Sequence, residues 1–164
     1  GSALVGKKFL MHNNNVQLDV VETGENWTSY YEKEGIKRIA HFYPDDHIKK
    51  YDLIITSHWL EHIIDLKLIL NSLYNNLNTH GILFVEVPNC DSLYWQNDIK
   101  DTPHLHFFTK NSLETLFSKY QFEVMFINTF GLTNGEFYSQ NFKNSIFNNE
   151  TKIEIENSNC DSES

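Results

Sequence analysis

Residues 51–62, which read Y-D-L-I-I-T-S-H-W-L-E-H, most strongly limit how this chain can fold. The apolar run at 53–55 is rich in β-branched residues and has polar neighbours, which is typical of a strand buried on both faces of a parallel sheet. Polar residues at 56–58 end the run, and an amphipathic segment follows at once. Such a change from strand to helix puts polar side chains at the carboxyl edge of a sheet, where open α/β folds bind ligands.

Apolar runs and helical patterns alternate along the rest of the chain. We predict further strands over 16–21, 36–42, 82–87, 122–130 and 151–156. We predict helices within 4–15 and over 26–34, 65–77, 111–120 and 137–147. Strands that alternate with helices favour an α/β domain with a mainly parallel sheet and flanking helices.

The ends of the predicted helices rest on capping residues. Asn26 and Asp65 are the expected N-caps of two helices, and Gly35 is expected to end the first of them. Asn111 with Glu114 three residues later has the pattern of a capping box.

Length and charge limit the class of protein. The 164 residues fit a single domain, which we place at 4–156, with a disordered tail at 157–164. Residues 1–3 resemble a cloning remnant. The formal net charge of −9 argues against nucleic acid as a partner, because phosphate binding needs a basic surface.

The compartment is predicted from cysteine use and hydropathy. Cys90 and Cys160 do not make a disulfide framework, which favours a reducing environment. We find neither an apolar run long enough to span a bilayer nor a signal peptide. We therefore expect a cytoplasmic protein without a membrane partner.

Five segments in order carry a resemblance to a known family. They are V-V-E-T-G-E-N at 20–26, Y-E-K-E-G-I at 31–36, Y-D-L-I-I-T-S-H-W-L-E-H at 51–62, G-I-L-F-V-E-V-P-N at 81–89 and H-L-H-F-F-T-K-N-S-L at 104–113. Together they resemble the class I S-adenosylmethionine-dependent methyltransferases, in the branch that modifies sugars and other small molecules. The resemblance implies a Rossmann-like fold, S-adenosylmethionine as cofactor and a small acceptor, such as a nucleotide-linked sugar.

The predicted cofactor site begins at Glu22. A carboxylate at the end of a strand can accept hydrogen bonds from both hydroxyls of a ribose, although the same residue could be a solvated loop carboxylate. The resemblance implies the ribose role, an adenine site at the end of the next strand, and a methionine site after residue 56. The residues assigned to the cofactor are Glu22, Thr23, Gly24, His41, Phe42, Ser57, His58 and Trp59.

One expected motif of the family is missing. Its Gly-rich cofactor turn should precede Val16, where only Gly6 fits as a last glycine before a helix. A second alignment takes L-D-V-V-E-T-G at 18–24 as a degenerate turn, and we rank it lower because only Gly24 fits. Two explanations of the missing turn stay open. Either the N-terminal half is truncated, so that the central strand is absent, or the natural protein is a degenerate relative of the family. A missing central strand would expose sheet edges, so we expect a homodimer.

His104 and His106 lie in a long irregular connection at 90–108, and both are predicted catalytic residues. An imidazole is suited to taking a proton during methyl transfer, although both rings could instead serve local hydrogen bonds. In sugar C-methyltransferases of similar sequence, a histidine at the place of His104 is the proposed base. The tyrosine that accompanies it there is replaced by Asp101.

Two other functions stay open as alternatives. The missing turn favours a catalytically inactive domain that serves as a scaffold or binds a partner. His58 to His62 also match H-x-x-E-H, a zinc metallopeptidase signature with Glu61 as base. We rank the peptidase last, because the motif begins at the end of a strand, and we predict no metal ligands.

Overall fold

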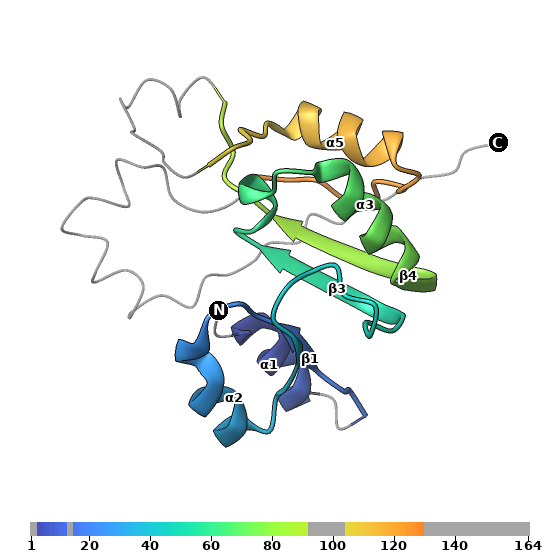
Figure 1. The fold of residues 1–164 in the computed structure, drawn as a ribbon. Helices are drawn as coiled ribbons and strands as arrows, with labels where there is room; N and C mark the ends of the chain where they lie inside the picture. The colour runs from blue at the N-terminus through green and yellow to red at the C-terminus, as the bar shows by residue number, and fades with distance from the viewer. Residues whose placement is uncertain (1–2, 13–14, 92–103, 130–164) are drawn as a thin grey trace, which may run out of the picture. The chain divides into compact units, whose positions relative to one another are not determined.

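The computed structural model describes residues 3–12, 15–91 and 104–129 (Figure 1). All of them belong to one compact unit. The predicted helix at 137–147, the strand at 151–156 and the tail at 157–164 lie outside the described residues. The helices are α1 (Leu4–His12), α2 (Thr28–Glu34), α3 (Leu66–Asn75) and α5 (Lys110–Lys119), with short 3-10 turns at Glu25–Trp27 and Leu60–His62.

The strands form two parallel pairs, which confirms the α/β class with parallel pairing. β1 (Asp19–Val21) pairs with β2 (Lys37–Ala40), and α2 makes the crossover between them. β3 (Tyr51–Ser57) pairs with β4 (Leu77–Glu86), with α3 as the crossover. Each pair is thus a βαβ unit, in which both strands direct their carboxyl ends to the same edge.

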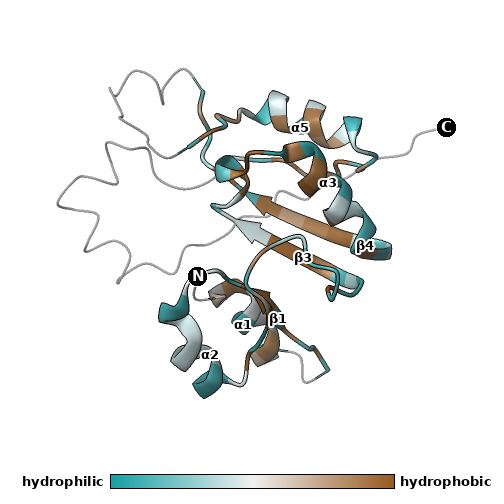
Figure 2. Ribbon diagram, in the orientation of Figure 1, coloured by the Kyte–Doolittle hydropathy of each residue, from teal (hydrophilic) through white to brown (hydrophobic). Residues whose placement is uncertain are grey.

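The hydrophobic core lies against the β3–β4 pair. α3 and α5 both contribute to it, and Figure 2 shows hydrophobic residues concentrated on β4 and along these helices. Leu83 and Val85 of β4 pack on this core, whereas Ile82 and Phe84, which alternate with them along the strand, are 53% and 42% exposed. The buried residues of the cluster are Leu60, Ile69, Leu70, Leu73, Phe108 and Phe117.

The prediction that the run at 53–55 is buried on both faces is wrong. Its three residues are only half-buried, because the core covers one face of the pair in the described part of the chain. β4 also begins earlier than predicted. Gly81, which was expected to precede the strand, lies inside it. Glycine suits this position, because a Cβ here would lie 2.9 Å from the carbonyl oxygen of Asn78 and 3.0 Å from that of Tyr51.

The helix ends follow the prediction at two of four positions. Asp65 caps α3 by accepting the backbone N–H of Leu68 at 2.9 Å, and Gly35 ends α2 with a φ of 67°. Asn26 is no cap, because it lies inside the 3-10 turn that precedes α2. The cap of α5 is Thr109 rather than Asn111.

Two further differences concern α1 and the segment after α5. In α1, Val5 is one of the apolar residues that could face a core from a helix within 4–15, and it is 43% exposed. Residues 122–129 are described and form no strand, so the strand predicted over 122–130 is wrong in its described part. Phe122 instead packs its ring edge-on against Phe117, at 5.5 Å between ring centroids.

Asn76, the residue that follows α3, forms hydrogen bonds with the loop between β2 and β3. Its side-chain Oδ1 accepts the hydroxyl of Tyr43 at 2.8 Å, and its Nδ2 donates to the carbonyl oxygens of Ile48 and Lys49 at 3.2 Å each. Tyr43 packs against the core beside Trp59. Among the described residues, none of the helices is both long and apolar enough to cross a membrane.

Candidate functional site

The predicted site residues form two groups at the carboxyl ends of different parallel pairs. The first group follows β1 and β2, and consists of Glu22, Thr23, Gly24, His41 and Phe42. The second group follows β3 and β4, and consists of Ser57, His58, Trp59, His104 and His106. Each group therefore lies at the carboxyl ends of its own pair, and the two pairs form separate two-stranded sheets in the described part of the chain.

Glu22 is held in place by its own loop. Its carboxylate Oε1 accepts the backbone N–H of Gly24 at 2.8 Å, and its backbone N–H donates to Ala40 at 3.2 Å. A Cβ at position 24 would lie 3.1 Å from Oε1, so a side chain there would press on the carboxylate. Thr23, between them, is exposed.

His41 and Phe42 lie on the surface directly after β2. The Phe42 side chain is 72% exposed, and the Nδ1 atom of His41 is 3.4 Å from Oε1 of Glu25. Glu25 also pairs with Arg38 at 3.0 Å. The hydrogen bond from Arg38, and a second one from Thr28, lower the pKa of the Glu25 carboxyl below its ordinary value.

Gly6 lies in the first turn of α1 and is buried. A Cβ at this position would lie 2.8 Å from Cδ1 of Leu18, next to the start of β1. Close packing of helix on strand is the role of the third glycine in dinucleotide-binding turns. Gly24, the glycine of the alternative alignment, lies between β1 and a 3-10 turn.

Ser57 and His58 are tied to the end of β4. The Ser57 hydroxyl donates to Oε2 of Glu86 at 2.6 Å, and the backbone N–H of His58 donates to the Glu86 carbonyl at 2.9 Å. His58 has a φ of 49°, in the left-handed region that non-glycine residues rarely adopt. Its side chain is 60% exposed.

Trp59 faces the core. Its ring lies edge-on to that of Tyr43, at 5.8 Å between centroids. Burial raises the pKa of Tyr43 above its ordinary value. Part of the predicted methionine site is therefore a packing residue that supports the strand end.

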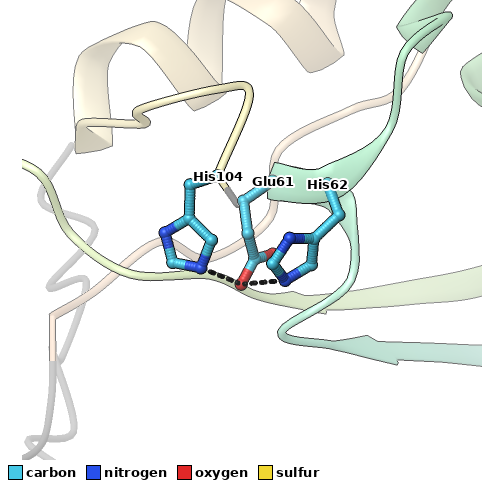
Figure 3. Close-up of side chains that lie close together, drawn as sticks. All are labelled: Glu61, His62 and His104. Atoms are coloured by element: carbon cyan, nitrogen blue, oxygen red, sulfur yellow. Dashed lines mark ion pairs between the residues drawn. The ribbon is translucent and has the colours of Figure 1, made fainter. Parts of the chain in front are cut away.

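Glu61 was not predicted as a residue of the methyltransferase site, because the sequence pattern indicated it only as the base of a peptidase signature. Its side chain is 1% exposed, and in the described part of the chain neither carboxylate oxygen accepts a hydrogen bond. Nε2 of His62 and Nε2 of His104 each lie 3.9 Å from its Oε1. Figure 3 shows the carboxylate between these two imidazole rings, whose centroids are 4.7 Å apart.

The Glu61 backbone fixes the segment that carries the predicted catalytic histidines. Its carbonyl oxygen accepts the backbone N–H groups of Leu105 at 2.9 Å and His106 at 3.0 Å. The His106 ring turns away from Glu61, since its Nε2 is 2.7 Å from the carbonyl oxygen of Ile63 and its ring stacks on Phe108. The structure thus brings His104, but not His106, to the buried carboxylate.

The helix that a peptidase signature requires is not formed at 58–62. His58 is left-handed, Trp59 follows it, and Leu60–His62 make a single 3-10 turn. Nδ1 of His58 is 3.5 Å from Oε1 of Glu61, so Glu61 lies among the three histidines His58, His62 and His104. The two histidines of the signature do not share a helix face.

A comparison with known proteins matches this chain to a protein family. A family model described as a methyltransferase domain matches residues 7–125. The match covers both parallel pairs and the two groups of predicted site residues. It also covers Glu61, His62 and His104, here called the Glu61 cluster. No curated protein matches the chain.

Proposed function

This chain belongs to the methyltransferase-domain family, and we propose that it transfers a methyl group from S-adenosylmethionine to a small acceptor, with a nucleotide-linked sugar or other glycan precursor as the candidate. The observation that carries the proposal is the family match, which extends over every predicted site residue. Methyl transfer as a class of activity follows from that membership. The cofactor and the acceptor are the proposed parts.

The group around Glu22 supports the cofactor. A carboxylate at the carboxyl end of a strand binds ribose hydroxyls in related folds, and Glu22 is held at such a position by the Gly24 N–H. The exposed Phe42 ring offers an apolar face on which an adenine can stack. The residues of this group therefore fit the nucleoside part of S-adenosylmethionine.

The chemistry that S-adenosylmethionine supplies when bound is an electrophilic methyl group on a sulfonium. The residues of the chain have to align the acceptor oxygen or carbon and remove its proton. We assign proton removal to His104, because Glu61 lies beside its ring and holds its segment through backbone hydrogen bonds. His106 is a positioning residue in this proposal, since its ring contacts the Ile63 carbonyl.

A second candidate function is a partner-binding module without methyl transfer. The observation in its favour is the sequence at 1–15, in which only Gly6 fits a glycine of the family's Gly-rich turn. Backbone N–H groups of that turn normally approach the cofactor closely, so a protein without them would bind the cofactor more weakly. Measurement of cofactor binding separates the two candidates.

The first experiment titrates S-adenosylmethionine and its demethylated product, S-adenosylhomocysteine, into the protein by calorimetry. We expect both to bind, and Glu22→Gln to weaken both by roughly 10- to 100-fold, because a hydrogen bond to a charged group contributes about 1.5–3 kcal/mol. Glu114→Gln, an exposed position on α5, is the matched control and should bind as the wild type does. Absence of heat at millimolar ligand would favour the partner-binding module.

The second experiment follows a labelled methyl group into a panel of nucleotide-linked sugars. His104→Gln is expected to lower kcat by on the order of 100-fold, the usual contribution of a positioned base. His47→Gln, an exposed histidine in the β2–β3 loop, should retain full activity. Equal activity in both variants would remove His104 from the chemistry. Cofactor binding without any labelled sugar would exclude this class of acceptor.

A further inference from the structure

We propose that Glu61, His62 and His104 form a binding site for one divalent transition-metal ion, for which zinc is the best match. Each of the three offers a ligand atom, and these atoms all lie within 4.8 Å of one another. They come from the 3-10 turn after β3 and from the segment after residue 103, so the fold assembles the site from distant parts of the sequence. The proposal does not rest on methyl transfer.

The burial of Glu61 is the first argument. An ionised carboxylate removed from water costs several kcal/mol unless it is hydrogen-bonded, paired or coordinated to a metal. Glu61 is 1% exposed, and within the described residues neither of its oxygens accepts a hydrogen bond. The nearest imidazole nitrogens, at 3.5–3.9 Å, are too distant for good hydrogen bonds. A cation between these groups would supply the missing partner.

The spacing of the ligand atoms is the second argument. Zinc–nitrogen and zinc–oxygen bonds of about 2.0–2.2 Å place two ligands of a tetrahedral ion about 3.4 Å apart. Nε2 of His62 and Nε2 of His104 each lie 3.9 Å from Oε1 of Glu61, so each of these two separations has to shorten by about half an ångström for tetrahedral coordination. Figure 3 shows both rings with a nitrogen directed to the same carboxylate oxygen.

The donor set selects the kind of ion. Two imidazole nitrogens and one carboxylate oxygen suit zinc and its neighbours, whereas magnesium and calcium prefer oxygen ligands alone. Three protein ligands also leave a fourth position open, as in zinc sites that bind water or a substrate oxygen. His62 is 35% exposed and His104 is 15% exposed, so the site is partly shielded and still reachable.

The same nitrogen of His104 cannot bind a metal and accept a proton at once. With an ion bound, His104 is a ligand, and the open position becomes the place at which an acceptor oxygen can lie. Without an ion, His104 is available as the base. The test below measures ion binding alone, so its result and that of the cofactor titration are independent.

The experiment removes metals from the protein with a chelator and titrates Zn²⁺ by calorimetry and Co²⁺ by visible absorption. We expect one ion per chain, an increase in Tm on binding, and the intense cobalt bands of a four-coordinate site. Glu61→Gln keeps the shape of the side chain but removes the charge, and should weaken Zn²⁺ binding at least 10-fold. His104→Gln should do the same.

His47→Gln is the matched control, because it removes an exposed histidine outside the cluster and should bind Zn²⁺ as the wild type does. Circular dichroism checks that each variant is folded, and Mg²⁺ is expected to give no increase in Tm. Absence of Zn²⁺ binding would overturn the proposal. Binding that is equal in wild type, Glu61→Gln and His104→Gln would also overturn it, because the ion would then lie elsewhere.

Discussion

The β1–β2 pair and the β3–β4 pair have the same βαβ topology but differ in what stabilises them. The first pair is short, and its neighbourhood combines three buried side chains, Tyr31, Ile36 and Ala40, with the ion pair between Arg38 and the exposed Glu25. The second pair is longer and packs on a hydrophobic cluster to which α3 and α5 both contribute. Among the described residues, the fully buried side chains Leu60, Leu70, Leu73 and Glu61 all belong to the second pair's region.

This difference determines which region can hold a buried ionisable cluster and which can bind a ligand at the surface. A buried ionisable cluster needs a tightly packed surrounding that excludes water, and the Glu61 cluster lies in the region that has one. A ligand that is gripped from the surface needs exposed groups on strand ends, which the first pair provides with Glu22 and Phe42. The four predictions below test how far the two regions differ in stability.

The largest expected effect is in the core of the second region. Leu70 is 0% exposed, and Leu70→Ala should lower the free energy of unfolding by about 2–5 kcal/mol through lost burial and a cavity. Ile39→Ala in β2 removes a half-buried side chain, and should cost about 1 kcal/mol. Urea denaturation measures both values. Equal losses would show that the first pair is packed as tightly as the second.

Alanine at a glycine tests the regions in different ways. Gly81→Ala in β4 should cost about 1–3 kcal/mol, because the new Cβ would lie 2.9 Å from the Asn78 carbonyl oxygen, a backbone atom. Gly35→Ala meets no atom within 4 Å, and should cost only about 1 kcal/mol for its left-handed φ of 67°. Thermal unfolding compares the two variants. A larger loss at Gly35 would contradict the steric reason given for Gly81.

The caps are expected to matter less. Thr109 accepts the backbone N–H of Ser112 at 3.2 Å, so Thr109→Ala should cost about 1 kcal/mol. Asn111→Ala, two positions later on an exposed turn, should change the free energy of unfolding by less than about 0.5 kcal/mol. In the first region α2 has no side-chain cap at Trp27. An equal loss of unfolding free energy in Asn111→Ala and Thr109→Ala would support Asn111 as the cap, as the sequence predicts.

A further effect, similar in size to that of the Thr109 cap, concerns a contact between the two pairs and depends on pH. Tyr51 at the start of β3 donates its hydroxyl to Asp19 at the start of β1, at 2.9 Å. Burial, and then the hydrogen bond to Asp19, raise the pKa of Tyr51 from 10.0 to about 12. The stabilisation is therefore complete below pH 10 and is lost as the pH rises to about 12.

Tyr51→Phe should cost about 1 kcal/mol at neutral pH and should lose less stability than the wild type between about pH 10 and 12. Urea denaturation at a series of pH values measures the difference, and tyrosinate absorbance follows the titration directly. A variant whose stability falls with pH as steeply as that of the wild type would show that Tyr51 does not contribute to the decline.

The sequence predicted the features that depend on neighbouring residues. The alternation of strand and helix, the end of β3 at Ser57 and the cap at Asp65 all follow from local patterns and are confirmed. It failed where two local signals compete. Asn26 and Asn111 both have the chemistry of a cap, but a 3-10 turn takes the first and Thr109 replaces the second. At α5 the choice is made by a reciprocal pair of hydrogen bonds: the Thr109 N–H donates to the Ser112 hydroxyl, and the Ser112 N–H donates to the Thr109 hydroxyl.

The sequence by itself therefore determined the α/β class and the membership of a methyltransferase family. Only the tertiary structure decided that Glu61 is buried, that His104 lies beside it and that His106 turns to the Ile63 carbonyl. The physical reason is that burial and long-range contacts arise from how the β3–β4 pair packs on α3 and α5. No pattern in residues 58–62 or 104–106 alone contains that packing.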